Sequence, residues 1–264
     1  MEKFKGLQLI KADASADIEL INQYSVKELT PDDVFCFSVV LCDNDVDRDL
    51  ERFADKTLDQ LAVLFVGKTG ISDHSWSSNR QIARLYRVEV RETAKKNALK
   101  EPLKQLVGSA YMLKSENTQP IIDAIEAGIW KEVSIGCAIK DCNCSICGKP
   151  LKLDWRSWTY QCETGHIKGE TYDGVQCVGS LENAIDAYEF SFVAVPAQRN
   201  AGVTKSAKDV DDAFAVLMTV DLSMHVDKVK NLLPRIKTAL ADAEERKARA
   251  EILRENKKFI KERN

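Results

Sequence analysis

The sequence lacks long hydrophobic runs, low-complexity tracts and an excess of charge of either sign. Its 264 residues include only 12 glycines and 6 prolines, which excludes collagen-like and wholly disordered chains. The longest apolar run, Val34 to Cys42, is about half of the roughly 20 residues that a membrane helix needs. The first residues turn acidic before a hydrophobic signal core can form. We therefore expect a soluble protein that stays in the compartment where it is made.

Basic and acidic residues nearly balance. The chain has 38 lysines and arginines against 41 aspartates and glutamates, a net charge of −3. Such a chain has no overall electrostatic attraction to nucleic acid or to a membrane surface. We expect neither direct nucleic-acid binding nor membrane association.

The eight cysteines fall into two groups. Cys36, Cys42 and Cys137 lie in apolar, strand-like segments and are predicted to be buried thiols. The other five crowd into one polar stretch, where clustered thiols without an export signal indicate metal rather than disulfides. These five are Cys142, Cys144, Cys147, Cys162 and Cys177.

Within that stretch, CxxC followed by CxxxH has the spacing of a tetrahedral zinc site. The predicted ligands are Cys144, Cys147, Cys162 and His166. Cys142 or Cys177 remains an alternative for one of them. Four protein ligands leave no open position, so the zinc is expected to be structural, with no cofactor for catalysis. Aromatic residues between the two pairs are expected to cover this module: Trp155, Trp158 and Tyr160.

Hydrophobic periodicity predicts alternating strands and helices before and after the cysteine-rich insertion at 141–180. Predicted helices lie at 57–67 and 121–125, and residues 209–264 read as a charged helical extension. Strands are expected at 34–42, 83–90, 106–113, 132–139 and 187–195, with strand-like fragments at 7–10 and 18–21.

Three residue types on these segments can support nucleophilic catalysis. His74 lies in a turn-rich segment. It is the one histidine left for acid–base chemistry if His166 binds zinc and His225 lies in the C-terminal helix. Ser134 is predicted to face away from its apolar neighbours on a strand, and Glu189 interrupts a hydrophobic strand. Taken singly, each also fits an ordinary structural role, and the pattern alone leaves both interpretations open.

The order of these segments resembles the tailed-phage prohead proteases, which are related in fold to herpesvirus assemblins. The resemblance covers residues 33–203. It rests on a loop Asp73-His74, a strand Val-Ser134-Ile-Gly, and a later strand Glu189-x-Ser191-x-Val193-x-x-Pro196-Ala197. A zinc-knuckle insertion resembles versions in phages and prophages of low-GC Gram-positive bacteria. The resemblance implies an α+β fold, a mostly antiparallel β-barrel flanked by helices.

The resemblance also implies a serine endopeptidase. Ser134 would be the nucleophile and His74 its general base, with Glu189 as the orienting acid and Asp73 or Asp186 as alternatives. Arg199 would assist the backbone amides of the oxyanion hole.

The same resemblance implies the biological setting. Residues 1–203 would form the protease domain, and 204–264 a helical extension that is scaffold-like or removed by self-cleavage. The expected partners are the scaffold and major capsid protein of a phage prohead, with the enzyme a homodimer in the bacterial cytoplasm, inside the assembling prohead. Two alternatives stay open: a non-catalytic capsid assembly or scaffold protein on the same fold, and a zinc-ribbon nucleic-acid adaptor.

Overall fold

The computed structural model describes residues 14–204, with side chains from residue 17 onward. The predicted helical extension beyond residue 204 and the fragment at 7–10 lie outside the described residues. The helices are α1 (Ala14–Ile21), α2 (Asp55–Leu64) and α3 (Gln119–Glu126), with short 3₁₀ turns at Pro31–Asp33 and Ser78–Arg80. The strands that build the large sheet are β1 (Val34–Asp43), β2 (Glu51–Phe53), β3 (Thr69–Ser72), β4 (Ala83–Lys96), β5 (Pro102–Leu113), β6 (Val133–Cys144), β11 (Gly179–Phe192) and β12 (Gly202–Thr204).

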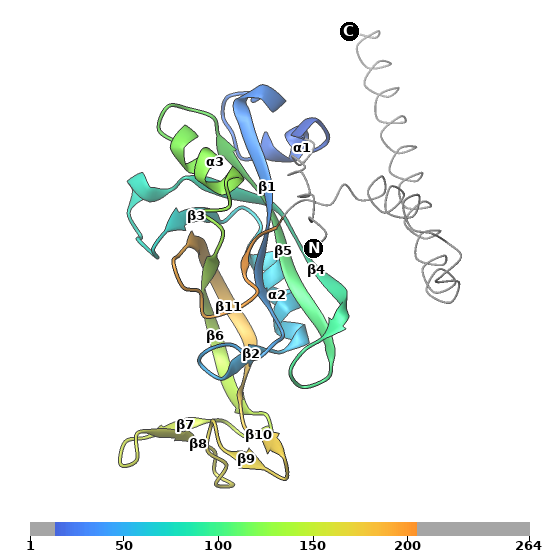
Figure 1. Ribbon diagram of the computed structural model, residues 1–264, viewed down its shortest axis with the longest axis vertical. Helices are drawn as coiled ribbons and strands as arrows, with labels where there is room; N and C mark the ends of the chain where they lie inside the picture. The colour runs from blue at the N-terminus through green and yellow to red at the C-terminus, as the bar shows by residue number, and fades with distance from the viewer. Residues whose placement is uncertain (1–13, 205–264) are drawn as a thin grey trace, which may run out of the picture. The chain divides into compact units, whose positions relative to one another are not determined.

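The large sheet is mixed, and most of its pairings are antiparallel (Figure 1). Its order is β12-β1-β5-β4-β3-β11-β2, and β6 pairs with β11. Only the pairings of β11 with β2 and with β3 are parallel. The predicted strands at 34–42, 83–90, 106–113, 132–139 and 187–195 each form part of this sheet, which confirms a predominantly β fold.

The expectation of a closed barrel is wrong for the part of the chain that the structure describes. A single bridge between Glu132 and Gly202 joins the start of β6 to β12. Beyond it, β6 follows β11 out of the sheet toward the cysteine-rich insertion, as Figure 1 shows. Because β6 diverges in this way, its second edge has no continuous partner strand within residues 14–204.

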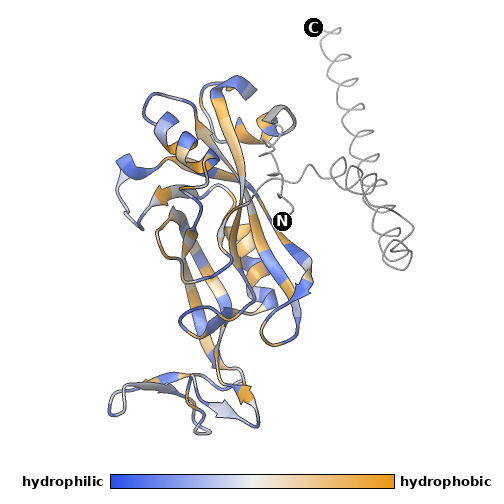
Figure 2. Cartoon of the chain, in the orientation of Figure 1, coloured by the Kyte–Doolittle hydropathy of each residue, from blue (hydrophilic) through white to orange (hydrophobic). Residues whose placement is uncertain are grey.

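The hydrophobic core lies between α2 and the strands, and the apolar residues are concentrated in the long strands and the helix (Figure 2). In α2, Leu58 and Leu61 are fully buried, as their helical spacing predicts. On β6, Val133 and Ile135 pack in this core. The intervening Ser134 therefore lies on the opposite face of the sheet, as the strand alternation predicts.

The strand-like reading of residues 18–21 is wrong, because this segment belongs to helix α1. Ile18 and Ile21 are three positions apart, so they share one face of a helix. They pack into a second apolar cluster with Leu29 and Val34. This packing against residues outside the segment favours the helix, and the four residues 18–21 alone do not reveal it.

The insertion forms a small module at the far end of β6 and β11 (Figure 1). It contains two short hairpins, β7 (Lys152–Asp154) with β8 (Thr159–Gln161) and β9 (Thr171–Tyr172) with β10 (Val175–Gln176). Its buried residues form a cluster of their own: Cys144, Leu151, Cys162 and Cys177. No helix within residues 14–204 is long and apolar enough to cross a membrane.

Candidate catalytic and metal sites

His74 is presented by a tight turn directly after β3. Asp73 and His74 have φ angles of 52° and 51°, and the amide of Ser75 donates to the carbonyl of Ser72 at 3.0 Å. Two successive positive φ angles define a type I′ turn. Without glycine, each such residue stores about 1–3 kcal/mol of backbone strain, so the surrounding contacts must hold the turn in place.

The imidazole of His74 meets the carboxylate of Glu189 on the neighbouring strand. Nδ1 lies 2.8 Å from Oε1, and the two side chains are 44% and 3% exposed. Of the three acids considered, Glu189 is the one that contacts this imidazole. Asp186 instead pairs with Lys68, and Asp73 is exposed. With Nδ1 bound to a carboxylate, Nε2 is the ring nitrogen that remains to exchange a proton with another group.

Ser134 lies on the next strand and on the same face of the sheet as Glu189. It is the direct antiparallel partner of Ser191, and Gly136 is the partner of Glu189. Directly opposed residues on antiparallel strands have their β-carbons about 5 Å apart, on one face. The sequence order His, Ser and acid is therefore rearranged in space, with the acid on the central strand and the other two on either side.

The structure does not join Ser134 to His74 by a hydrogen bond. The Ser134 side chain is half-buried, and within residues 14–204 its hydroxyl has no hydrogen-bond partner. Catalytic hydrogen bonds are often long in the absence of substrate and shorten when it binds. The pair His74–Glu189 is thus formed, while Ser134 lies one strand away with its hydroxyl unpaired.

Two further site residues stand in the predicted motifs, but the sequence interpretation gave them no role. Ser191 is fully buried and bonded to both His74 and Glu189, and Gly136 lies under the Glu189 carboxylate. The available signal was the strand period of two, which puts residues 189 and 191 on one face of their strand and residues 134 and 136 on one face of theirs.

Arg199 is not brought to this pair. It lies exposed in the turn that follows Pro196. No hydrogen bond or ion pair links it to Ser134 or His74 within the described chain. Its role at an oxyanion hole stays a prediction.

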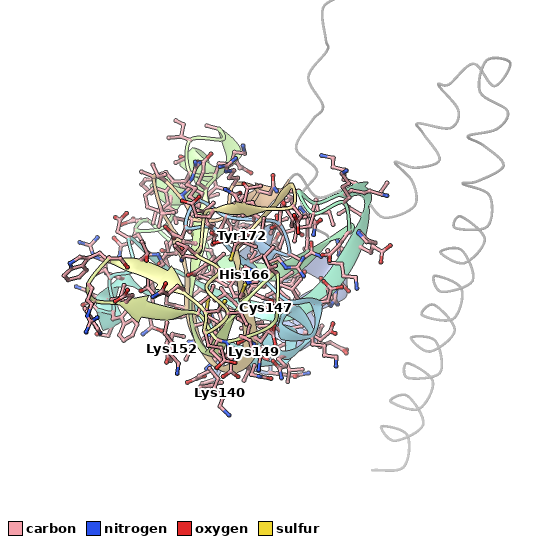
Figure 3. The ribbon with its side chains drawn as sticks, turned by 90° about the horizontal axis from the view of Figure 1, so that it is seen from below. Lys140, Cys147, Lys149, Lys152, His166 and Tyr172 are labelled. Atoms are coloured by element: carbon pink, nitrogen blue, oxygen red, sulfur yellow. The ribbon has the colours of Figure 1, made fainter. Side chains whose placement is uncertain are left out.

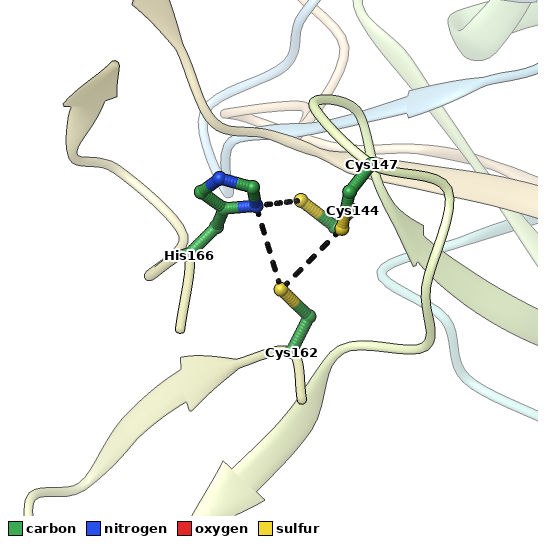
Figure 4. A group of neighbouring side chains, drawn as sticks. All are labelled: Cys144, Cys147, Cys162 and His166. Atoms are coloured by element: carbon green, nitrogen blue, oxygen red, sulfur yellow. Dashed lines mark hydrogen bonds between the residues drawn. The ribbon is translucent and has the colours of Figure 1, made fainter. Parts of the chain in front are cut away.

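The second site is in the small module, where four side chains converge (Figure 4). Cys144 and Cys147 come from the turn at the end of β6, and Cys162 and His166 from the loop after β8. Their ligand atoms all lie within 4.8 Å of one another, and this cluster can bind a metal ion. It is the same set of four that the sequence spacing predicts.

The distances within this cluster fit tetrahedral coordination. Nδ1 of His166 lies 3.7 Å from Sγ of Cys144 and 3.6 Å from Sγ of Cys162, and the Cys147 and Cys162 sulfurs are 3.6 Å apart. A tetrahedron with Zn–S and Zn–N bonds of about 2.3 and 2.0 Å has edges of about 3.5–3.8 Å. The four donors are therefore compatible with zinc.

Each half of the cluster has a tight turn that ends in a glycine with a positive φ angle. Gly148 has a φ of 71° and donates its amide to the carbonyl of Cys144 at 2.8 Å. Gly165 has a φ of 88° and donates to Cys162 at 2.9 Å. These turns require a left-handed residue, which glycine supplies without strain. The Thr164 hydroxyl hydrogen bonds to Cys147 and lowers the pKa of that thiol to about 7, which favours the metal-binding thiolate.

The two remaining thiols of the module, Cys142 and Cys177, pack beside the four predicted ligands. Cys177 is fully buried with its sulfur 3.5 Å from that of Cys144, and Cys142 is half-buried. Seen from the module end, Cys147 and His166 lie toward the middle of the view (Figure 3). The ring of Tyr172 packs edge-on against the His166 imidazole, with centroids 4.6 Å apart.

The expectation that aromatic residues cover the module is wrong. Trp155 and Trp158 are 70% and 72% exposed and contact each other edge to face, and Tyr160 is 45% exposed. The physical reason is that β7 and β8 form a two-stranded hairpin. Trp155 and Trp158 lie in the turn that joins these two strands, and neither is among the residues that pack around the cysteines.

A scan against models of known protein families finds no match, and a search of curated proteins finds no relative of this chain.

Proposed function

We propose that this protein is a serine endopeptidase in which Ser134 is the nucleophile, His74 the general base and Glu189 the acid that orients His74. The observation that supports this most directly is the contact between the His74 ring and the Glu189 carboxylate. Nδ1 lies 2.8 Å from Oε1, and the Glu189 side chain is only 3% exposed. When a buried acid binds Nδ1 of a histidine, Nε2 is the nitrogen that can accept a proton from a nucleophile. Ser134 supplies a hydroxyl on the same face, one strand away.

The reaction follows from these roles. The Ser134 oxygen attacks the carbonyl carbon of the scissile peptide, and its proton passes to Nε2 of His74. Glu189 accepts the Nδ1 hydrogen bond and stabilises the imidazolium that forms. The tetrahedral adduct then breaks its C–N bond as Nε2 gives the proton to the leaving amine. Water, deprotonated by the same nitrogen, hydrolyses the acyl-enzyme and restores Ser134.

We further propose that the cluster of three cysteines and His166 binds zinc with a structural role. Sulfur and imidazole donors at tetrahedral spacing are the ligand type that zinc prefers. With four protein ligands, a bound zinc has no position for water, and the module's small core gives it a folding role.

The substrate class follows from the resemblance to prohead proteases. We propose that the enzyme cleaves capsid scaffold and its own chain during phage or prophage capsid maturation. Residues 202–204 form β12 of the sheet. We therefore propose cleavage after this strand, in residues 205–208, which are small or polar as is typical of a cleavable linker.

Intact-mass measurement of freshly purified protein, incubated over hours, tests the activity. Parent protein that loses a C-terminal fragment beginning after residue 204, while Ser134→Ala and His74→Ala stay whole, would support a self-processing serine protease. A parent that stays whole even with its co-encoded scaffold would contradict it.

One observation favours the alternative, a non-catalytic capsid assembly or scaffold protein on the same fold. The Ser134 hydroxyl and the His74 imidazole form no hydrogen bond with each other in this structure. Two residues with purely structural roles would not need such a bond. Labelling with a fluorophosphonate separates the two functions, because this reagent reacts only with activated serine hydroxyls. Labelling of Ser134 that needs His74 would exclude the non-catalytic alternative.

A further inference from the structure

The structure assigns Ser191 a positioning role: its hydroxyl joins the His74 turn to the Glu189 carboxylate and so fixes the base and its acid relative to each other. This inference rests on the proposed function, in which His74 is the general base. Ser191 belongs to the strand motif that begins at Glu189, but the expected triad does not include it and the sequence analysis gives it no role.

The hydroxyl of Ser191 makes two hydrogen bonds at the site. It accepts from the backbone amide of His74 at 3.0 Å and donates to Oε2 of Glu189 at 2.7 Å. The other carboxylate oxygen, Oε1, meets the His74 ring. The backbone and the side chain of the histidine are therefore both tied to one carboxylate, the first through the serine and the second directly.

The burial of this arrangement makes the hydroxyl hard to replace by water. Ser191 is 0% exposed and Glu189 is 2% exposed as whole residues. If Ser191 loses its hydroxyl, Oε2 of the buried Glu189 carboxylate loses this hydrogen bond, and solvent does not replace it. The hydrogen bond to an ionised acceptor is also of the stronger, charge-assisted type.

The turn that carries His74 needs such an anchor. Its two positive φ angles are unfavourable for residues other than glycine. Besides the contact of the His74 ring with Glu189, two hydrogen bonds attach the backbone of the turn to β11. In the first, the amide of Asp73 donates to the carbonyl of Phe192 at 3.0 Å, and in the second, the amide of His74 donates to Ser191. Of these two backbone bonds, the first has a backbone acceptor. Only the second involves a side chain, so a single substitution can remove it.

Ser191 itself does not fit the role of nucleophile. Its oxygen is shielded from solvent, and its proton is directed at Glu189 rather than at the imidazole. Its partner across the strands, Ser134, is the half-buried hydroxyl that a substrate can reach. Ser191 therefore acts through His74 and Glu189, without contacting the reacting atoms.

Two measurements on the full-length protein test this role. The first is the rate at which a fluorophosphonate labels Ser134, read as a function of pH. The second is the downfield proton resonance of a histidine Nδ1–H bound to a carboxylate, which NMR detects whether or not the protein is active. The variants are Ser191→Ala, Ser191→Thr, which keeps the hydroxyl, and Ser191→Cys, which keeps the volume but bonds weakly. Ser180→Ala, a buried serine at the other end of β11, is the matched control.

We expect Ser191→Ala to lower the labelling rate at least about tenfold, to change its pH profile and to lose the downfield resonance. Ser191→Thr should restore most of the rate, and Ser180→Ala should behave as the parent. If Ser191→Ala does not fold, Ser191→Cys must show the same losses. A downfield resonance and a pH profile unchanged in Ser191→Ala, or in Ser191→Cys where that is the folded variant, would overturn the positioning role. If the parent protein shows the downfield resonance but is not labelled, the proposed catalysis is overturned instead. The loss or retention of the resonance in the Ser191 variants would then decide whether Ser191 positions His74.

Discussion

The carboxylate of Glu189 lies directly over the α-carbon of Gly136, its partner across β6 and β11. A β-carbon built on Gly136 would overlap Oε1, the oxygen that contacts His74. The glycine two residues after Ser134 thus provides the space in which the acid approaches the imidazole. No other residue at this position leaves that space open.

Gly136→Ala is therefore expected to displace the carboxylate and weaken its hold on His74. A shift of about 1 Å in a catalytic group can cost about 100-fold in rate, and we expect a loss of that order in fluorophosphonate labelling of Ser134. Gly108→Ala is the control, because a β-carbon there meets the end of the flexible Leu85 side chain in the core, away from this site. Equal loss of labelling in both variants would contradict the specific role of Gly136.

Glu189→Gln keeps the shape of the side chain but removes its charge. The amide can then favour the wrong imidazole tautomer, which leaves Nε2 protonated and unable to accept the Ser134 proton. The corresponding change in a known triad costs about 10⁴-fold, and we expect at least about 100-fold slower labelling and self-cleavage. Glu182→Gln, on the same strand but away from the site, is the control. Near-parental rates in Glu189→Gln would show that the acid is not needed.

Loss of a metal ligand should unfold the small module. Cys144→Ser and Cys147→Ser are each expected to lower the zinc content from about one ion per chain to near zero and to lower the melting temperature. Cys142→Ser changes a thiol outside the four-residue cluster and should retain the metal. Zinc measured by mass spectrometry of the purified variants, with thermal melts, checks this. A zinc-free variant that melts like the parent would show that the metal does not stabilise the fold.

Asp47 should make stability depend on pH. Burial raises the pKa of its carboxyl, although the backbone amides of Glu51 and Asp49 donate to it and act in the opposite direction. Since the folded pKa is above the unfolded one, the folded state binds more protons between the two values, and the free energy of unfolding falls as pH rises through that window.

Asp47→Asn keeps the acceptor oxygen and removes the buried charge. It should raise the melting temperature at neutral pH by up to about 4 °C, the shift that about 1 kcal/mol produces in a domain of this size. The gain should vanish below about pH 4, where the unfolded carboxyl is also protonated. Asp49→Asn, an exposed neighbour, should change little. A gain that persists in acid would show that the charge of Asp47 is not its cause.

Local pattern alone predicted much of the fold and both sets of candidate residues. The apolar alternation around Ser134 placed Val133 and Ile135 in the core and the serine on the opposite face. The cysteine spacing selected the four residues that converge in the module. Both are short-range properties, because a strand period and a two-residue knuckle are complete within a few positions of the chain.

Only the tertiary structure decided which acid meets His74. That contact joins residues 115 positions apart, and it depends on the parallel pairing of β3 with β11, which no local period encodes. The same holds for Ser191 and Gly136, whose roles come from partners on other strands. It holds for the helix at 18–21 and the open sheet as well, since burial against distant residues and the path of β6 override local propensity. The sequence by itself therefore determined which residues can do chemistry and on which face they lie, and the long-range strand pairing determined which of them meet.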